Sequence, residues 1–159
     1  MSVPDHSSTQ TGWREWVKLN GIGVPWIKAK IDTGAQTSAL HATEITEFER
    51  SGAPWVRFLV QPWQVTDDDA VEVELPVHDR RTVRSSSGHA QLRPVVLMRV
   101  SLAGRTIEAE VTLTDREEMV FRMLIGREAL RQGFVVDSAA SYLGGKPSRR
   151  TRRRNRGRE

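Results

Sequence analysis

Short stretches of alternating apolar and polar residues, separated by Gly, Pro, Asn or Asp, recur along this chain. A period of two places one side-chain face in a core and the other in solvent, as in a half-buried β-strand. There is no long helical period and no internal repeat. We therefore predict an all-β domain, with strands in residues 13–19, 25–31, 37–42, 55–60, 71–77, 95–102, 106–113, 123–125 and 134–136.

Three segments depart from the strand pattern. Residues 44–50 predict one or two helical turns, ended by Gly52 and Pro54. Residues 127–132 predict a brief helix, ended by Gly133. Residues 80–94 are polar and predict an irregular connection.

The length and the charge distribution indicate one domain with loose ends. A chain of 159 residues suits a single domain. We expect a disordered leader over residues 1–12, the domain over residues 13–143 and a disordered Arg-rich tail over residues 144–159.

The tail carries the positive charge of the protein. From Lys146 onward it holds eight Lys or Arg and one Glu, and the rest has 16 basic and 19 acidic residues, a charge of −3. Such a run buries no apolar surface. Weak contact with RNA or another polyanion and a merely solvated tail are equal alternatives. Sequence-specific nucleic-acid recognition is not expected, because the tail has no aromatic residue to stack on bases.

Composition predicts a cytoplasmic protein. The chain has no cysteine, which excludes disulfides and thiolate metal sites and fits a reducing compartment. No apolar run is long enough to span a bilayer, and residues 1–12 lack the apolar centre of a signal peptide. No membrane contact is expected.

The candidate catalytic residues lie in the sequence AKIDTGAQTSAL, residues 29–40. An apolar strand runs into Asp32, Thr33, Gly34 and Ala35 and then resumes. Taken alone, Asp-Thr-Gly-Ala fits an ordinary turn, since Asp and Gly are common turn residues. A second motif, RMLIGREALRQG at residues 122–133, makes the turn alone a weaker explanation.

Together these motifs resemble the retropepsin-like aspartic peptidases, whose core is an apolar strand, D-[TS]-G-A and, further on, apolar residues, Gly, Arg and a short helix. More closely, the chain is similar to the bacterial proteins labelled ATP-dependent zinc proteases, over residues 13–143. The matching segments are residues 32–42, 81–88, 93–96 and 124–130.

The resemblance implies a small closed β-barrel with one short helix and a water activated by two Asp32 carboxylates. Like charges so close cannot both ionise, so the pair shares a proton. With one D-T-G per chain, the pair implies a homodimer. Thr33 would bond to the partner loop, Gly34 would permit close approach, and Ile125, Gly126 and Arg127 would support the loop.

Two departures from the retroviral pattern concern the substrate. Gln36 replaces an acidic residue, and a basic, serine-rich stretch at residues 81–94 replaces a glycine-rich flap. We predict that this stretch receives an acidic, glutamate-rich protein tail, since guanidinium groups suit carboxylates; a solvated surface loop is the alternative. The predicted substrate-binding residues are Ala35, Arg84, Ser85, Ser86 and Arg93.

The label of the similar proteins names zinc and ATP, but the residues support neither cofactor. There is no H-E-x-x-H, no cysteine, four His and no phosphate-binding G-x-x-x-x-G-K-[ST] loop. His41, seven residues after Gly34, is the best candidate if a metal binds. Two rivals to the peptidase stay open: a non-catalytic module that binds an acidic or ribosome-linked partner, and a zinc-dependent hydrolase.

Overall fold

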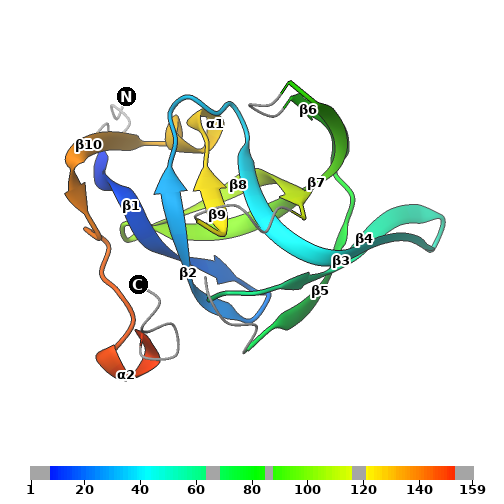
Figure 1. Ribbon diagram of the computed structural model, residues 1–159, viewed down its shortest axis with the longest axis horizontal. Helices are drawn as coiled ribbons and strands as arrows, with labels where there is room; N and C mark the ends of the chain where they lie inside the picture. The colour runs from blue at the N-terminus through cyan, green and yellow to red at the C-terminus, as the bar shows by residue number, and fades with distance from the viewer. Residues whose placement is uncertain (1–7, 64–68, 85–87, 116–120, 153–159) are drawn as a thin grey trace, which may run out of the picture.

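Strands dominate the computed structural model, which describes residues 8–63, 69–84, 88–115 and 121–152 (Figure 1). The helices are α1 (Arg127–Leu130) and α2 (Arg149–Arg152). The strands are β1 (Thr9–Asn20), β2 (Val24–Ile31), β3 (Ser38–Arg50), β4 (Ala53–Val60), β5 (Val71–Pro76), β6 (Asp79–Arg84), β7 (Ala90–Leu102), β8 (Arg105–Thr114), β9 (Met123–Ile125) and β10 (Phe134–Ser141).

Six strands close into a barrel, in the order β1, β2, β9, β3, β8, β7 and back to β1. The closing pair is β1 with β7, where Leu19 lies opposite Val100. The prediction of an all-β, small closed barrel of the retropepsin-like type is confirmed. Strand β9 is short but central, because it lies parallel to β2 on one side and antiparallel to β3 on the other.

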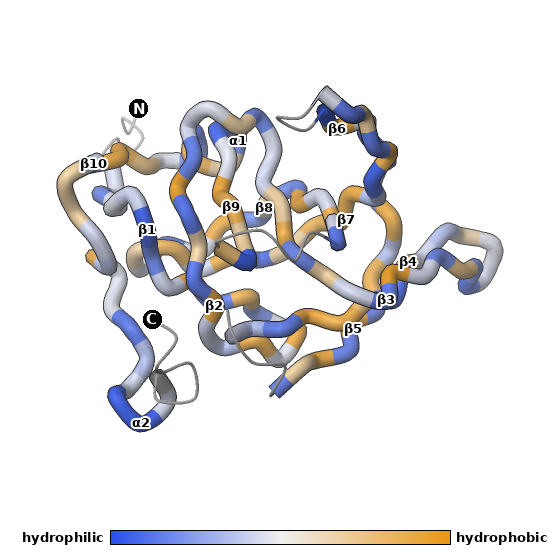
Figure 2. The backbone as a smooth tube through the Cα atoms, viewed as in Figure 1, coloured by the Kyte–Doolittle hydropathy of each residue, from blue (hydrophilic) through white to orange (hydrophobic). Residues whose placement is uncertain are grey.

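The barrel interior is filled by the apolar face that the alternation predicts. The largest fully buried apolar side chains of the core come from strands far apart in the sequence, including β4 outside the barrel: Leu19, Ile27, Leu40, Phe58, Leu102, Leu113, Met123 and Ile125. Figure 2 shows these apolar stretches along the barrel strands and hydrophilic residues on α2. No helix in the described ranges is long and apolar enough to cross a membrane.

Strand β3 belongs to two sheets, and this overturns the helix predicted for residues 44–50. Its first part, from Ser38 to His41, pairs with β8 in the barrel. Its register shifts between Thr43 and Thr46, around Glu44 with its φ of 51°. Residues 46–50 then pair with β4, and β4 pairs with β5. The hydrogen bonds to β4 outweigh the weak local preference for a helix.

Residues 80–94, predicted to be irregular, form most of a β-hairpin instead. Strands β6 and β7 pair antiparallel from Asp79 opposite Val95 to Arg84 opposite Ala90. The local sequence is polar because both faces of this hairpin are largely exposed. Residues 85–87, which join the two strands, lie outside the described part of the chain.

Regular structure extends into both segments that were predicted to be disordered. Strand β1 begins at Thr9 rather than residue 13, because residues 9–12 pair in parallel with residues 134–137 of β10. At the other end, Pro147 is buried and α2 forms a second helix in the segment predicted to be disordered. Residues 1–7 and 153–159 lie outside the described ranges.

Candidate active site

The loop after β2 presents Asp32 at one end of the barrel. The Asp32 peptide N–H donates to the carbonyl oxygen of Ile125 over 2.8 Å, and the Ala35 N–H donates to the Asp32 carbonyl over 3.2 Å. The Gly34 N–H donates to the Asp32 carboxylate at Oδ1 over 3.0 Å. Asp32 is half-buried, while Thr33 and Gly34 are exposed. The carboxylate is thus oriented by its own loop and accessible at the surface.

Residues 125–127 form hydrogen bonds with this loop and with the start of β3. The Gly126 N–H donates to Ser38 Oγ over 3.0 Å, and the Arg127 N–H donates to the Ala35 carbonyl over 2.7 Å. The Arg127 guanidinium also donates to the Thr33 carbonyl over 3.1 Å. Each contact joins the start of β3 or the Asp32 loop to a residue about 90 positions later. The loop geometry therefore depends on β9 and α1.

Gly126 leaves no room for a side chain where it packs against the backbone of the Asp32 loop. A Cβ on Gly126 would lie 2.7 Å from the Thr37 carbonyl carbon, 2.8 Å from its oxygen and 3.0 Å from the Ala35 oxygen. Backbone atoms cannot give way as a flexible side chain does. We expect Gly126→Ala to lower the free energy of unfolding by about 1–3 kcal/mol, measured by urea denaturation. Gly52→Ala changes a glycine with φ of 79° and no atom within 4 Å of the added Cβ. Gly52→Ala therefore measures the cost of an alanine at positive φ without a close contact, and an unchanged free energy of unfolding for Gly126→Ala would contradict the close-contact argument.

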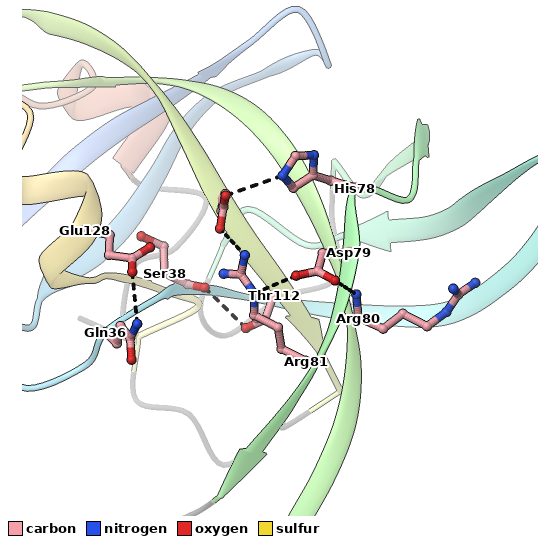
Figure 3. A network of polar contacts seen from close by, with 9 residues as sticks. Gln36, Ser38, His78, Asp79, Arg80, Arg81, Thr112 and Glu128 are labelled. Atoms are coloured by element: carbon pink, nitrogen blue, oxygen red, sulfur yellow. Dashed lines mark hydrogen bonds and ion pairs between the residues drawn. The ribbon is translucent and has the colours of Figure 1, made fainter.

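Three polar residues near the loop, Ser38, Thr112 and Glu128, were missed by the sequence reasoning. Figure 3 shows Gln36 facing Glu128, with Gln36 Nε2 donating to Glu128 Oε1 over 3.0 Å. Thr112 Oγ1 donates to the carbonyl oxygen of Ser38 over 3.2 Å, and both residues are buried. Hydroxyl residues inside otherwise apolar strands were the available signal, because a buried hydroxyl needs a partner.

The base of the β6–β7 hairpin is tied to the barrel by charged groups. The Arg81 guanidinium pairs with Asp79 at 2.9 Å and with Glu110 of β8, and His78 lies 3.4 Å from Glu110 (Figure 3). The Arg80 peptide N–H and the Arg81 guanidinium lower the pKa of Asp79. Burial opposes the charged form of Arg81, but Glu110 and Asp79 together raise its pKa. Arg81 is therefore occupied within the protein.

The predicted substrate-binding residues differ in how they are placed. Arg84, at the end of β6, is exposed and donates to the Gly88 carbonyl over 2.9 Å. Arg93 is only 5% exposed and donates to Gln91 Oε1 over 3.0 Å. Ala35 is half-buried in the Asp32 loop. Ser85 and Ser86 lie outside the described residues.

Metal donors do not gather in the described part of the chain, where no group of three or more His, Cys, Asp or Glu could hold an ion. His41 is fully buried on β3, and its peptide N–H donates to the Arg122 carbonyl over 2.7 Å. The described residues therefore do not offer the donor set of a zinc site.

Comparisons with known proteins agree with this geometry. A family model described as "RimB-like: Retropepsin-like aspartic endopeptidase RimB" matches residues 10–147. A crystal structure of a Legionella pneumophila protein of unknown function superposes with a TM-score of 0.72, at 29% identity over 86% of this chain and 98% of that one.

Curated relatives carry a different name. A Shewanella pealeana protein named "Probable alpha-L-glutamate ligase" is 42% identical over 82% of this chain and 29% of its own length. A Desulfotalea psychrophila protein of the same name is 38% identical over 87% of this chain and 30% of its own length. This chain thus spans less than a third of these relatives.

Proposed function

Because the chain belongs to the RimB-like family of retropepsin-like aspartic endopeptidases, we propose that it hydrolyses peptide bonds with a water activated by two Asp32 carboxylates. The observation that carries this proposal is the Asp32 loop, exposed at Thr33 and Gly34 and held by residues 125–127. One such loop per chain supports a homodimer in which the two copies of Asp32 face each other.

Two adjacent carboxylates that share one proton can act as base and acid together. The ionised Asp32 takes a proton from water while the water oxygen forms a bond to the carbonyl carbon. The protonated Asp32 gives its proton to the carbonyl oxygen. The resulting diol collapses as one hydroxyl loses a proton and the amide nitrogen gains one, and the C–N bond breaks. The Gly34 N–H, on Oδ1, orients the carboxylate throughout.

The substrate we propose is a glutamate-rich protein tail, recognised by Arg84. Arg80 and Arg81 are paired with Glu47 and with Asp79 and Glu110, whereas no carboxylate pairs with Arg84 within the described ranges. An exposed guanidinium without an acidic partner can bind a substrate carboxylate through bidentate hydrogen bonds. The name of the relatives, "Probable alpha-L-glutamate ligase", supports glutamate as the repeated residue of the substrate tail. Arg93 is buried, so we assign it to hairpin support.

Replacing Arg84 tests this substrate. We expect Arg84→Ala to lower kcat/KM for a poly-glutamate peptide about tenfold or more, because a charge-assisted hydrogen bond is lost. Cleavage of a neutral peptide should not change. Arg57→Ala on β4 removes an exposed guanidinium that lies 4.0 Å from Glu72 and serves as the control. An equal loss on both peptides would remove Arg84 from substrate recognition.

Sedimentation velocity tests the homodimer directly. A dimer at the concentration where peptide is cleaved is the expected result. A monomer that binds glutamate peptides without cleaving them would favour the binding module instead. The separate β3–β4–β5 sheet favours that alternative, because it adds bulk beside the barrel.

A further inference from the structure

On β1 and β2 two lysine ammonium groups lie over aromatic rings, the half-buried Trp26 and the buried Trp16. Lys18 Nζ lies 4.8 Å from the centre of the Trp26 ring, and Lys28 Nζ lies 5.1 Å from the centre of Trp16. Tyr142, just after β10, lies 5.9 Å from the same Lys28 ammonium. We call these residues the Trp26 surface. The Trp26 surface contains aromatic residues, which the Arg-rich tail lacks.

A cavity of about 220 Å³ opens at the Trp26 surface. It lies between β1 and β2, the β7–β8 turn and the segment that follows β10. The residues lining it include Trp16, Lys18, Trp26, Ser101, Gly104 and Gly144. Trp26 is half-buried and Lys18 is exposed, so a ring and an ammonium group are presented together at its edge.

Lys18 contributes an exposed ammonium group to the Trp26 surface. No ion pair joins Lys18 to a carboxylate in the described ranges, whereas Arg50, Arg57, Arg80 and Arg81 are all paired with Asp or Glu. Two acids lie nearby: Asp69 accepts a hydrogen bond from Trp63 Nε1 over 2.8 Å, and Glu15 accepts one from the Gly144 N–H over 3.0 Å. Trp63 packs edge-on against Trp16 at 6.2 Å. An exposed ammonium group without an ion pair in the described ranges therefore lies at the edge of the cavity.

The Arg-rich segment begins beside this cavity. The Glu15 carboxylate accepts the N–H groups of Leu143 and Gly144, each over 3.0 Å, and Gly144 lines the cavity. The chain then continues through buried Pro147 to α2, where Arg149 and Arg150 are exposed. Figure 1 shows α2 at the end of the molecule away from the loop between β2 and β3. The exposed Arg149 and Arg150 thus follow within six residues of Gly144, which lines the cavity.

We propose that the Trp26 surface binds a single-stranded polynucleotide, with a base stacked on Trp26 and the adjacent phosphate held by Lys18. Aromatic side chains stack on any base, and cations along the backbone supply the rest of the affinity without sequence preference. An acidic peptide would use the cations but has no ring to stack on the indole. Trp26 precedes Asp32 by six residues of extended strand, about 20 Å, so this site is separate from the peptidase site.

Fluorescence anisotropy of a labelled oligouridylate of about 12 nucleotides, titrated with the full chain at several salt concentrations, tests the proposal. We expect Trp26→Ala to weaken binding about tenfold through lost stacking. Lys18→Ala should lower the slope of log affinity against log salt by about one. Asp32→Asn should bind the oligonucleotide as the unchanged protein does.

Trp55→Ala on β4 is the matched control, because the Arg50 guanidinium lies 4.2 Å from the Trp55 ring but is paired with Glu74 at 3.2 Å. We expect no change for this variant. Absence of oligonucleotide binding, an equal loss at Trp55→Ala, or full displacement by a poly-glutamate peptide of the same charge would overturn the proposal.

Lys18→Glu keeps the proposal testable even if Trp26→Ala unfolds, because it changes only an exposed side chain. Reversing this charge should weaken oligonucleotide binding more than Lys18→Ala does, since the phosphate then meets a carboxylate. Unchanged affinity of a folded Lys18→Glu protein would overturn the assignment of the phosphate to Lys18.

Discussion

Replacing Asp32 by Asn is expected to reduce peptide hydrolysis by about a thousandfold or more while the protein stays folded. The amide keeps the size of the side chain and can still accept the Gly34 N–H at its oxygen. It cannot ionise, so neither subunit can take a proton from water. Mass spectrometry of a poly-glutamate peptide measures the rate, and circular dichroism checks the fold.

Asp115→Asn is a suitable control, because Asp115 is an exposed aspartate at the end of β8. Its variant should cleave as the unchanged chain does. Full activity of Asp32→Asn would rule out the paired-carboxylate mechanism. Mixing Asp32→Asn with unchanged subunits adds a second test, since a dimer with one Asn should be inactive if both carboxylates take part.

Removing the Glu15 carboxylate is expected to cost about 3 kcal/mol of stability. Glu15 is fully buried on β1, and its carboxylate accepts three peptide N–H groups, from Gly12 at 2.7 Å and from Leu143 and Gly144. Glu15→Ala leaves these donors without an acceptor, and each buried unsatisfied donor costs about 1–3 kcal/mol. The melting temperature should fall by roughly 10 °C, measured by differential scanning calorimetry.

Glu15→Gln keeps the shape and one carbonyl oxygen, so it should lose less than Glu15→Ala. Glu49→Ala, an exposed glutamate on β3, should melt as the unchanged protein does. If Glu15→Ala melted at the unchanged temperature, the carboxylate would not be what fastens the segment after β10 to β1.

The barrel strands were predictable because their signal is local. Alternation over residues 25–31 and 106–113 reports a buried face whatever partner covers it, and both segments lie in strands. The first residues of β1 gave no such signal. Thr9 to Gly12 are polar or small, and they form a strand because β10, more than 120 residues later, pairs with them.

The extension of β3 was mistaken for a helix for a related reason. Residues 44–50 contain two glutamates flanking Phe48, a pattern compatible with either a helix or a strand. Pairing with β4 favours the strand, because Trp55 of β4 lies opposite Phe48. Short segments of mixed pattern are decided by tertiary pairing rather than by propensity.

Individual residues likewise differ in whether the sequence alone reveals their role. Asp32 to Ala35 and Gly126 could be found from the sequence, because the motif itself requires those residue types. Glu15, which lies outside the candidate active site, could not be found in this way, since a glutamate in an alternating strand is typical of a solvent-facing position. Only the fold brings the N–H groups of residues 143 and 144 to that carboxylate and makes a buried charge acceptable.

The hydrogen bond from Asp32 to Ile125 sets an order of events during synthesis. A ribosome that adds about 5–20 residues per second needs roughly 5 to 20 seconds to travel from the first of these residues to the second. Throughout that interval the growing polypeptide already contains the D-T-G sequence but lacks the strand and helix that shape it. The hydrogen bonds that hold the Asp32 loop therefore form late, near the completion of the barrel, and the proposed hydrolysis requires the strand and helix made after that interval.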